Sequence, residues 1–283
     1  MTSAKQRTIK KAVSYRGIAL HTGYRAKLTL RPADENTGIV FVRADLPGNP
    51  TVRSLGHNVT EVERGTTIEE NGTKIHTIEH VLAALTSQGI DNVICEMDRS
   101  EPPIADGSSL PFIKMIHESG IVEQNAEREY FRVTKPHFLE QDHAIITIVP
   151  SEDFRISCTV KYDQSQMDCQ FFSLTVTEES FTKELSEART FCGYHELEYL
   201  MKAGLIRGGS LDNATVMHND IILSKDGLRY PDEFVRHKML DIVGDFTLLG
   251  RPLKGHIIAV KPGHPSNVTM VQQLLKLEEE GAL

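Results

Sequence analysis

The stretch Arg236-His-Lys-Met-Leu-Asp-Ile-Val-Gly-Asp245 carries one imidazole and two carboxylates at intervals of four residues. On an α-helix this spacing places His237, Asp241 and Asp245 along one edge, with successive side chains about 40° apart around the axis. Imidazole and carboxylate groups are natural ligands of a divalent metal such as zinc. Short motifs predict sites loosely, and many such pairs are only solvated helix faces. The rest of the chain must therefore decide between a metal site and a charged surface.

Composition narrows the class of protein. The chain has 283 residues, of which 40% are hydrophobic and 25% charged, as in a globular protein of one large or two modest domains. The net charge of -8 argues against nucleic acid as a partner. The polar N-terminus and the lack of a long apolar run predict neither a signal peptide nor a transmembrane segment. The four widely spaced cysteines suggest reduced thiols in a cytoplasmic protein.

The two halves of the chain resemble each other in layout. A polar stretch at residues 118–129 is predicted to be a linker, which divides the chain into α+β domains at residues 1–125 and 126–283. Each half is expected to hold alternating strands, one amphipathic helix, an apolar strand and a final helix. The expected strands are residues 25–30, 38–42 and 92–97, then 144–149, 155–162 and 255–260. The final helices follow turn-rich segments at residues 105–109 and 262–267, and the second of these is expected to hold His264 in a loop.

The two amphipathic helices predict how the halves assemble. One apolar stripe comprises Ile78, Val81, Leu82 and Leu85, and the other comprises Val235, Met239, Ile242, Phe246 and Leu249. His80 and His237 lie opposite these stripes. If each stripe packs on its own sheet, the opposite faces meet, and Ala83 and Ala84 allow a close approach. The expected fold is α+β with two similar domains, each a β-sheet with two helices, packed helix layer to helix layer as a β-α-α-β sandwich.

The residues that would converge between the helix layers suggest hydrolytic chemistry. Two histidines and one carboxylate, here His80, His237 and Asp241, are typical of catalytic zinc with an open coordination position. Glu79 could serve as a general base toward a metal-activated water. His264 could act as an acid whose pKa Asp245 raises, and Lys238 could meet developing negative charge. Each of these side chains could instead be an ordinary solvated group.

Motifs distributed over nearly the whole chain resemble one family, the UDP-3-O-acyl-N-acetylglucosamine deacetylases, which are zinc amidases at the committed step of lipid A biosynthesis. In chain order the motifs are Gly17-Ile-Ala-Leu-His-Thr-Gly23, Arg64-Gly-Thr-Thr67, Thr77-Ile-Glu-His80, Pro103-Ile-Ala-Asp-Gly-Ser108, Ala188-Arg-Thr-Phe191, Arg207-Gly-Gly-Ser210, Arg236-His-Lys-Met-Leu-Asp241 and Gly263-His-Pro-Ser-Asn267. An ordered set of this size is far more specific than any single motif.

The resemblance implies a role for each site residue. It implies Zn²⁺ bound by His80, His237 and Asp241, a ligand set that also suits Fe²⁺. It implies Glu79 as general base and His264, supported by Asp245, as the acid that protonates the leaving amine. It further implies that the oxyanion is stabilised by Thr190 and Lys238. It implies that the substrate is bound by Phe191, Gly209 and Lys238. His21 is expected near the site without a firm role.

The implied substrate is a small-molecule UDP-sugar with one acyl chain. An inserted segment around residues 194–223 could form the wall of its apolar channel, although its helix could equally be one that packs on the core. The sequence departs from the family at Ala19 and Cys192, where the family has glycine, and both changes could alter the shape of the pocket. Two alternatives remain open: a zinc amidase of the same fold acting on another N-acyl sugar, and an inactive module that binds metal or sugar nucleotide.

Overall fold

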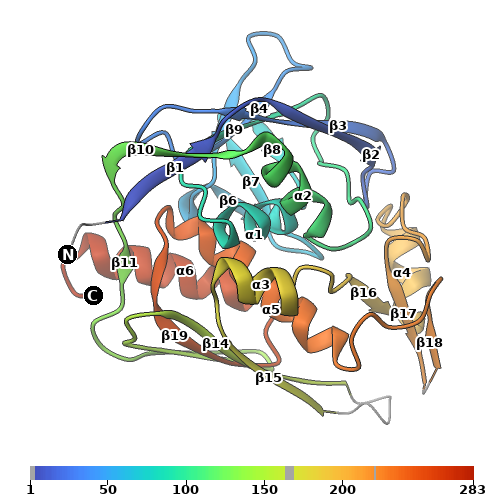
Figure 1. The fold of residues 1–283 in the computed structure, drawn as a ribbon. Coiled ribbons are helices and arrows are strands. Elements are labelled where there is room, and N and C mark those ends of the chain that lie inside the picture. Colours follow the sequence, from blue (N-terminus) through green and yellow to red (C-terminus); the bar gives the residue numbers. More distant parts are fainter. Residues whose placement is uncertain (1–3, 163–168, 220) are drawn as a thin grey trace.

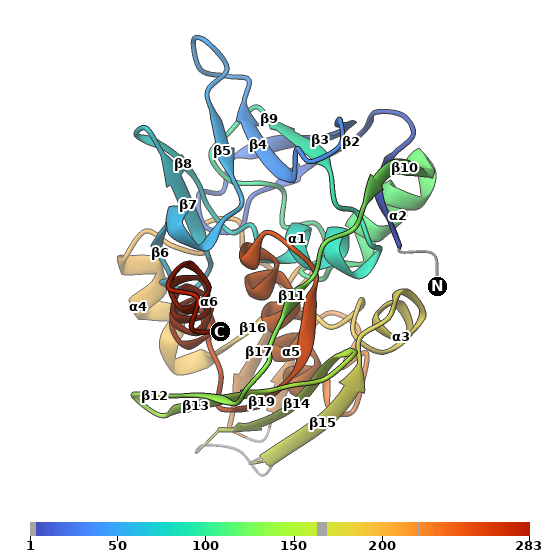
Figure 2. The ribbon, with the colours of Figure 1, turned by 90° about the vertical axis from the view of Figure 1, so that its left-hand side faces the viewer.

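The computed structural model describes residues 4–162, 169–219 and 221–283, and it places helices between two main β-sheets (Figures 1 and 2). The first sheet has the strand order β2 (Val13–Ile18), β3 (Arg25–Pro32), β9 (Val93–Met97), β4 (Ile39–Arg43) and β5 (Thr51–Arg53). The second has the order β12 (His137–Gln141), β13 (Ala144–Val149), β19 (Leu253–Val260), β14 (Phe154–Lys161) and β15 (Cys169–Thr175), with β11 (Phe131–Arg132) paired to β19.

The two sheets share one topology. The central strand of each, β9 or β19, pairs antiparallel with the strand on one side, β3 or β13. It pairs parallel with the strand on the other side, β4 or β14. Both central strands follow a main helix in the sequence, and their inward residues are fully buried, as in Cys95 and Ile257. The structure thus confirms the expected α+β sandwich built from two similar units.

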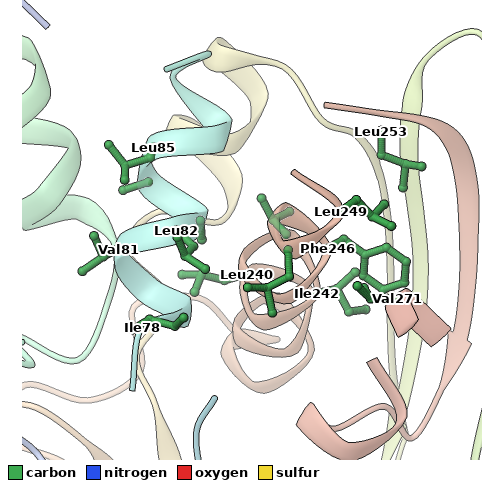
Figure 3. Packing of buried hydrophobic residues seen from close by; sticks show 14 of the residues in the cluster. Ile78, Val81, Leu82, Leu85, Leu240, Ile242, Phe246, Leu249, Leu253 and Val271 are labelled. Carbon is green, nitrogen blue, oxygen red and sulfur yellow. The ribbon is translucent and has the colours of Figure 1, made fainter. Parts of the chain in front are cut away.

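Four helices form the layers between the sheets (Figures 1 and 2). They are α1 (Glu79–Ser87), α2 (Leu110–Ser119), α5 (Glu233–Phe246) and α6 (His264–Glu279). Their apolar residues belong to one buried cluster that also includes strand residues such as Leu253. Figure 3 shows Leu240 on the side of α5 that faces α1, and Phe246 on the side toward β19. Helices α1 and α5 therefore pack on each other across the interface between the halves, while α5 and α6 also pack on the second sheet.

Smaller elements surround this sandwich. They are the ribbon of β1 (Lys5–Ile9) and β10 (Ile121–Glu127), the sheet of β6 (Val59–Glu61), β7 (Thr67–Glu70) and β8 (Thr73–Ile75), the sheet of β16 (Phe191–Gly193), β17 (Thr215–His218) and β18 (Ile221–Leu223), helices α3 (Glu178–Glu184) and α4 (Leu197–Lys202), and the 3₁₀ turns η1 (Gly56–Asn58), η2 (Tyr194–Glu196) and η3 (Thr247–Leu249). Within the described ranges, no helix combines the length and apolar character needed to cross a bilayer.

Two local expectations are wrong. Residues 121–127 are not a linker but strand β10, whose backbone pairs antiparallel with β1 from Lys5 to Ile9. Their polar side chains suit a surface ribbon, where backbone pairing rather than apolar burial holds the strand. The predicted domain division after residue 125 falls inside β10 and stays a prediction. His264 is likewise not in a loop, because it is the first residue of α6, directly after the N-cap Gly263.

The main helices of the two halves come close together at Gly244 of α5. A Cβ atom there would lie 2.2 Å from the carbonyl oxygen of Glu79, the first residue of α1. Real Cβ atoms do not come that close to backbone oxygen, so only glycine fits. The alanines at positions 83 and 84 are fully buried, yet Gly244 is the residue that brings α5 against the start of α1.

We expect Gly244→Ala to destabilise the protein, measured as the free energy of unfolding in urea. Alanine in a helix interior normally stabilises by about 1 kcal/mol relative to glycine. Here the clash with Glu79 should reverse the sign and cost about 1–3 kcal/mol, as overpacked sites do. A variant as stable as the parent would show that the helices do not need this contact.

Candidate active site

The start of α1 and the middle of α5 bring three potential metal ligands together. His80 Nε2 lies 3.9 Å from Asp241 Oδ1, and His237 Nε2 lies 3.4 Å from the same oxygen. The two imidazole rings are nearly perpendicular, with centroids 5.1 Å apart. All three side chains are buried. Four-residue spacing on α5 and the facing turn of α1 thus produce the cluster that helix periodicity predicted.

The hydrogen bonding of this cluster fits a bound cation. Asp241 Oδ1 is buried and has no donor among the described residues, although two imidazole nitrogens face it. His237 uses its other nitrogen, Nδ1, to donate to the carbonyl oxygen of Ala188 at 3.0 Å, which leaves Nε2 without a proton. A buried carboxylate oxygen beside the unprotonated Nε2 of His237 and the Nε2 of His80, whose Nδ1 has no partner among the described residues, is a poor hydrogen-bonding arrangement and a good set of metal ligands.

The protonation states agree with metal binding. Burial lowers the pKa of His80 to about 3 and also lowers the pKa of His237, so both imidazoles are neutral at pH 7. Burial alone would raise the pKa of Asp241, but the neighbouring His237 and Lys238 hold it well below its usual range. The cluster therefore offers two neutral nitrogens and one carboxylate, the forms that bind a divalent metal.

Glu79 lies beside this cluster without belonging to it. Its side chain is 2% exposed, and Oε2 accepts a hydrogen bond of 3.0 Å from the backbone N–H of Thr66. Burial raises the pKa of this carboxyl to about 7. A carboxyl poised near neutral pH beside a metal site is suited to accept a proton from water.

His264 and Asp245 form a hydrogen-bonded pair next to Asp241 of this cluster. His264 Nδ1 donates to Asp245 Oδ2 at 2.9 Å, and His264 Nε2 lies 3.9 Å from Asp241 Oδ2. Burial alone would lower the pKa of His264, but the carboxylates of Asp245 and Asp241 raise it to about 9. The imidazole is therefore protonated at neutral pH, with one N–H held by Asp245 and the other directed toward the metal ligands.

Lys238 forms a partly buried ion pair rather than a free cation. Its Nζ donates to Asp241 Oδ2 at 2.8 Å and lies 5.5 Å from the centre of the Phe191 ring. Although burial would lower the pKa of Lys238, its contact with Asp241 raises it. The ammonium is thus held between the metal cluster and Phe191.

The other predicted site residues do not all lie in one cleft. Phe191 lines a cleft of about 420 Å³ together with Lys238, Arg64, Tyr162 and Lys261. Thr190 is half-buried, and its backbone N–H donates to the carbonyl oxygen of Gly107 at 2.9 Å. It lies two residues after Ala188, whose carbonyl oxygen accepts from His237. Gly209 lies in an exposed turn and is not among the residues that line this cleft.

His21 and Ala19 lie in a neighbouring loop. His21 Nε2 is 3.2 Å from the carbonyl oxygen of Arg64, and the ring lines a separate cleft of about 310 Å³. The backbone N–H of Gly208 donates to Leu20 at 3.0 Å, so two of the sequence motifs pack on each other. A Cβ at Gly208 would lie 2.1 Å from the carbonyl oxygen of Ala19, which gives this glycine a packing role.

The insert carries exposed apolar side chains. In α4, Leu200 is buried, whereas Tyr199 and Met201 are 59% and 62% exposed. Ile221 on β18 is 58% exposed. The helix is therefore not simply one that packs on the core. Cys192 lies beside Phe191 in the cleft, and burial raises the pKa of its thiol to about 11, so it is not a thiolate at neutral pH.

Sequence reasoning missed the residues that hold the candidate site side chains. Thr66 and Asn267 both donate to Asp245, through Oγ1 at 2.6 Å and Nδ2 at 2.9 Å. Ala188 supplies the carbonyl that orients His237. The family motifs contain all three residues, but neither spacing nor periodicity connects residue 66 with residue 245. Only the packing of the two halves brings them together.

The chemistry of this interface is that of a metal-dependent hydrolase, because a buried ligand set has a carboxyl base on one side and a protonated imidazole on the other. A family model described as UDP-3-O-acyl N-acetylglycosamine deacetylase matches residues 6–276. The chain belongs to this family, and it is a deacetylase. Both the resemblance drawn from the motifs and the expected enzyme class are confirmed.

Relatives support this assignment over the full length. The chain is 44% identical to a protein of Chlamydia abortus, with 98% of this chain and 99% of that protein covered. It is 42% identical to one of Myxococcus xanthus, covering 97% and 87%, and 43% identical to one of Saccharophagus degradans, covering 97% and 91%. Each relative is named UDP-3-O-acyl-N-acetylglucosamine deacetylase.

We expect the purified chain to hold about one divalent metal ion, and His237→Ala to bind it at least about tenfold more weakly because a ligand is lost. Metal analysis after dialysis against a buffered metal concentration measures this. His256→Ala is a matched control, because His256 lies on β19 and contacts Ser157 rather than the cluster. Equal metal content in the two variants would contradict the assigned ligands.

Proposed function

We propose that the chain hydrolyses the N-acetyl group of UDP-3-O-acyl-N-acetylglucosamine, with Zn²⁺ bound by His80, His237 and Asp241. The products are acetate and UDP-3-O-acyl-glucosamine, the step that commits this sugar to lipid A biosynthesis. The proposed substrate is inferred from membership of the family. The observation that carries the metal is the buried Asp241 Oδ1, which has no donor among the described residues and faces two imidazole nitrogens.

A divalent ion at these ligands supplies a Lewis acid that polarises the amide carbonyl and acidifies water. The ligand set suits Zn²⁺ and also Fe²⁺. We favour zinc because two neutral imidazoles and one carboxylate leave an open position, as in catalytic zinc sites.

Glu79 accepts the proton of the attacking water. Its pKa of about 7 means that the carboxylate form is available at neutral pH, while its affinity for a proton remains high. The backbone N–H of Thr66 fixes Oε2, and Oε1 is proposed to accept the proton. The base is therefore held on α1 next to a ligand, not on a mobile loop.

His264 donates a proton to the departing nitrogen. An amide nitrogen leaves poorly as an anion, so the acid must be protonated before the C–N bond breaks. The charge of Asp245 keeps the imidazole protonated and fixes its Nδ1, which leaves the Nε2 proton for the substrate. Lys238 and Thr190 are the proposed partners of the developing oxyanion.

The substrate is proposed to bind along Phe191 and Lys238. Lys261 adds positive charge to the same cleft, in which Arg64 is paired with Glu196, and this charge is proposed to meet the diphosphate. The exposed apolar side chains of the insert, such as Met201 and Ile221, are proposed to meet the acyl chain. Gly209 is proposed to border the substrate from the turn that follows α4. We place the reaction in the cytoplasm, where UDP-sugars are made.

The test of this function is acetate release from UDP-3-O-acyl-N-acetylglucosamine carrying acyl chains of different lengths. We expect release that requires the acyl chain and is lost on chelation. Equal activity on N-acetylglucosamine derivatives that lack the acyl chain would favour an amidase for another N-acyl sugar. No release with any substrate, from metal-loaded protein, would favour a binding module.

Two variants should separate the base from the acid while the metal is retained. Glu79→Gln and His264→Gln should each lower kcat by at least about 100-fold, a typical contribution of one proton-transfer group. Metal analysis on the same samples should show parental content, since neither side chain is proposed as a ligand. A nearly normal kcat in either variant would remove that residue from the mechanism.

The pH dependence should identify the role of Asp245. Activity requires ionised Glu79 and protonated His264, so kcat/KM should be bell-shaped. It should fall on the basic side as pH rises through the His264 pKa, which the carboxylates raise to about 9. Asp245→Asn removes one of these charges and should move the basic limb down by at least about one pH unit. An unmoved basic limb would show that Asp245 does not set this pKa.

A further inference from the structure

Thr66 is a fully buried residue that contacts both proton-transfer groups. It directly precedes β7, and all of its surface is covered. Its backbone N–H donates to Glu79 Oε2 at 3.0 Å, and its hydroxyl donates to Asp245 Oδ1 at 2.6 Å. We propose that Thr66 is a positioning residue that holds the base and the acid of the deacetylation reaction in fixed positions relative to each other. This inference rests on the roles proposed above for Glu79 and His264.

The direction of the hydroxyl bond follows from counting protons. Asp245 Oδ2 accepts from His264 Nδ1 and from Asn267 Nδ2, both at 2.9 Å. Nδ1 therefore carries a proton, and at 3.3 Å from Thr66 Oγ1 it can only donate to that oxygen. The single hydroxyl proton of Thr66 is then free to go to Asp245 Oδ1. Thr66 thus completes the coordination of Asp245 and also touches the imidazole that Asp245 holds.

The backbone of Thr66 fixes the start of α1. Its carbonyl oxygen accepts from the N–H of Ile78, the N-cap of α1, at 3.3 Å. The preceding Gly65 passes so close that a Cβ there would lie 3.2 Å from Glu79 Oε1. One residue therefore ties the helix that carries the base to the Asp245–His264 pair, which links α5 with the first residue of α6.

Loss of the hydroxyl has a specific consequence. Asp245 Oδ1 would be buried without a donor, and the carboxylate could turn to find another partner. His264 Nδ1 would lose its fixed acceptor, so the Nε2 proton would point less often at the leaving nitrogen. The backbone bond from Thr66 to Glu79 would remain. The predicted defect is therefore in kcat, with KM and metal binding unchanged, because misorientation affects the reacting geometry.

The experiment compares Thr66→Val, which has the same shape without the hydroxyl, with Thr66→Ser, which keeps it. Thr66→Val should lower kcat by about 10- to 100-fold, the usual effect of a lost hydrogen bond to a charged group. Thr66→Ser should return kcat to within about threefold of the parent. KM and metal content should remain within about twofold in both.

Thr67→Val is the matched control. Thr67 is the next residue and is also buried, but its hydroxyl contacts His76 at 3.0 Å and not the catalytic pair. We expect its kcat to stay within about twofold of the parent. A similar loss in Thr67→Val and Thr66→Val would reduce the effect to general disturbance of the buried strand and would overturn the proposal.

A second readout does not depend on activity. The Nδ1 proton of His264 should give a downfield NMR resonance, assigned by its loss in His264→Gln. Thr66→Val should shift or broaden this resonance, and Thr66→Ser should restore it. An unchanged resonance together with a normal kcat would overturn the proposal. If the parent releases no acetate, the proposed function fails, while the resonance still decides whether Thr66 holds the pair.

Discussion

The contact between Gly244 of α5 and the backbone of Glu79 is the constraint on which the rest of the structure depends. It sets the separation of the two halves at the start of α1, where a Cβ would come within 2.2 Å of a carbonyl oxygen. At that separation His80 on α1 comes together with His237 and Asp241 on α5 in one potential metal-binding cluster. A wider spacing would leave the histidines as isolated buried groups, which are costly without partners.

Buried charge is balanced across this interface. Asp241 and Asp245 carry negative charge, and Lys238 and protonated His264 oppose it, while His80 and His237 remain neutral because burial disfavours their charged forms. Breaking one partner of such a network leaves an uncompensated charge. The proposed catalytic groups belong to the same network, since burial raises the pKa of Glu79 to about 7 and the carboxylates raise the pKa of His264 to about 9. The interactions that balance this buried charge are thus the ones on which the proposed mechanism rests.

Periodicity predicted the sandwich and the cluster of His80, His237 and Asp241, because three-residue and four-residue spacings fix helix faces directly. Polar composition, by contrast, wrongly predicted a linker at residues 118–129, because the pairing of residues 121–127 with β1 depends on backbone hydrogen bonds that side-chain patterns do not record. Periodicity could not find Thr66, since contacts between residues 66 and 245 arise only when the two halves dock. The family resemblance named Phe191 and Gly209 as substrate residues. Of the two, only Phe191 lines the cleft.

The most direct test of this account is a titration of metal-free protein with Zn²⁺, with acetate release from UDP-3-O-acyl-N-acetylglucosamine followed at each addition. If one ion bound by His80, His237 and Asp241 is the catalytic centre, the rate should start near zero, rise in proportion to added metal and level off at about one equivalent per chain. Full activity in metal-free protein, or a rate that requires several equivalents, would contradict it.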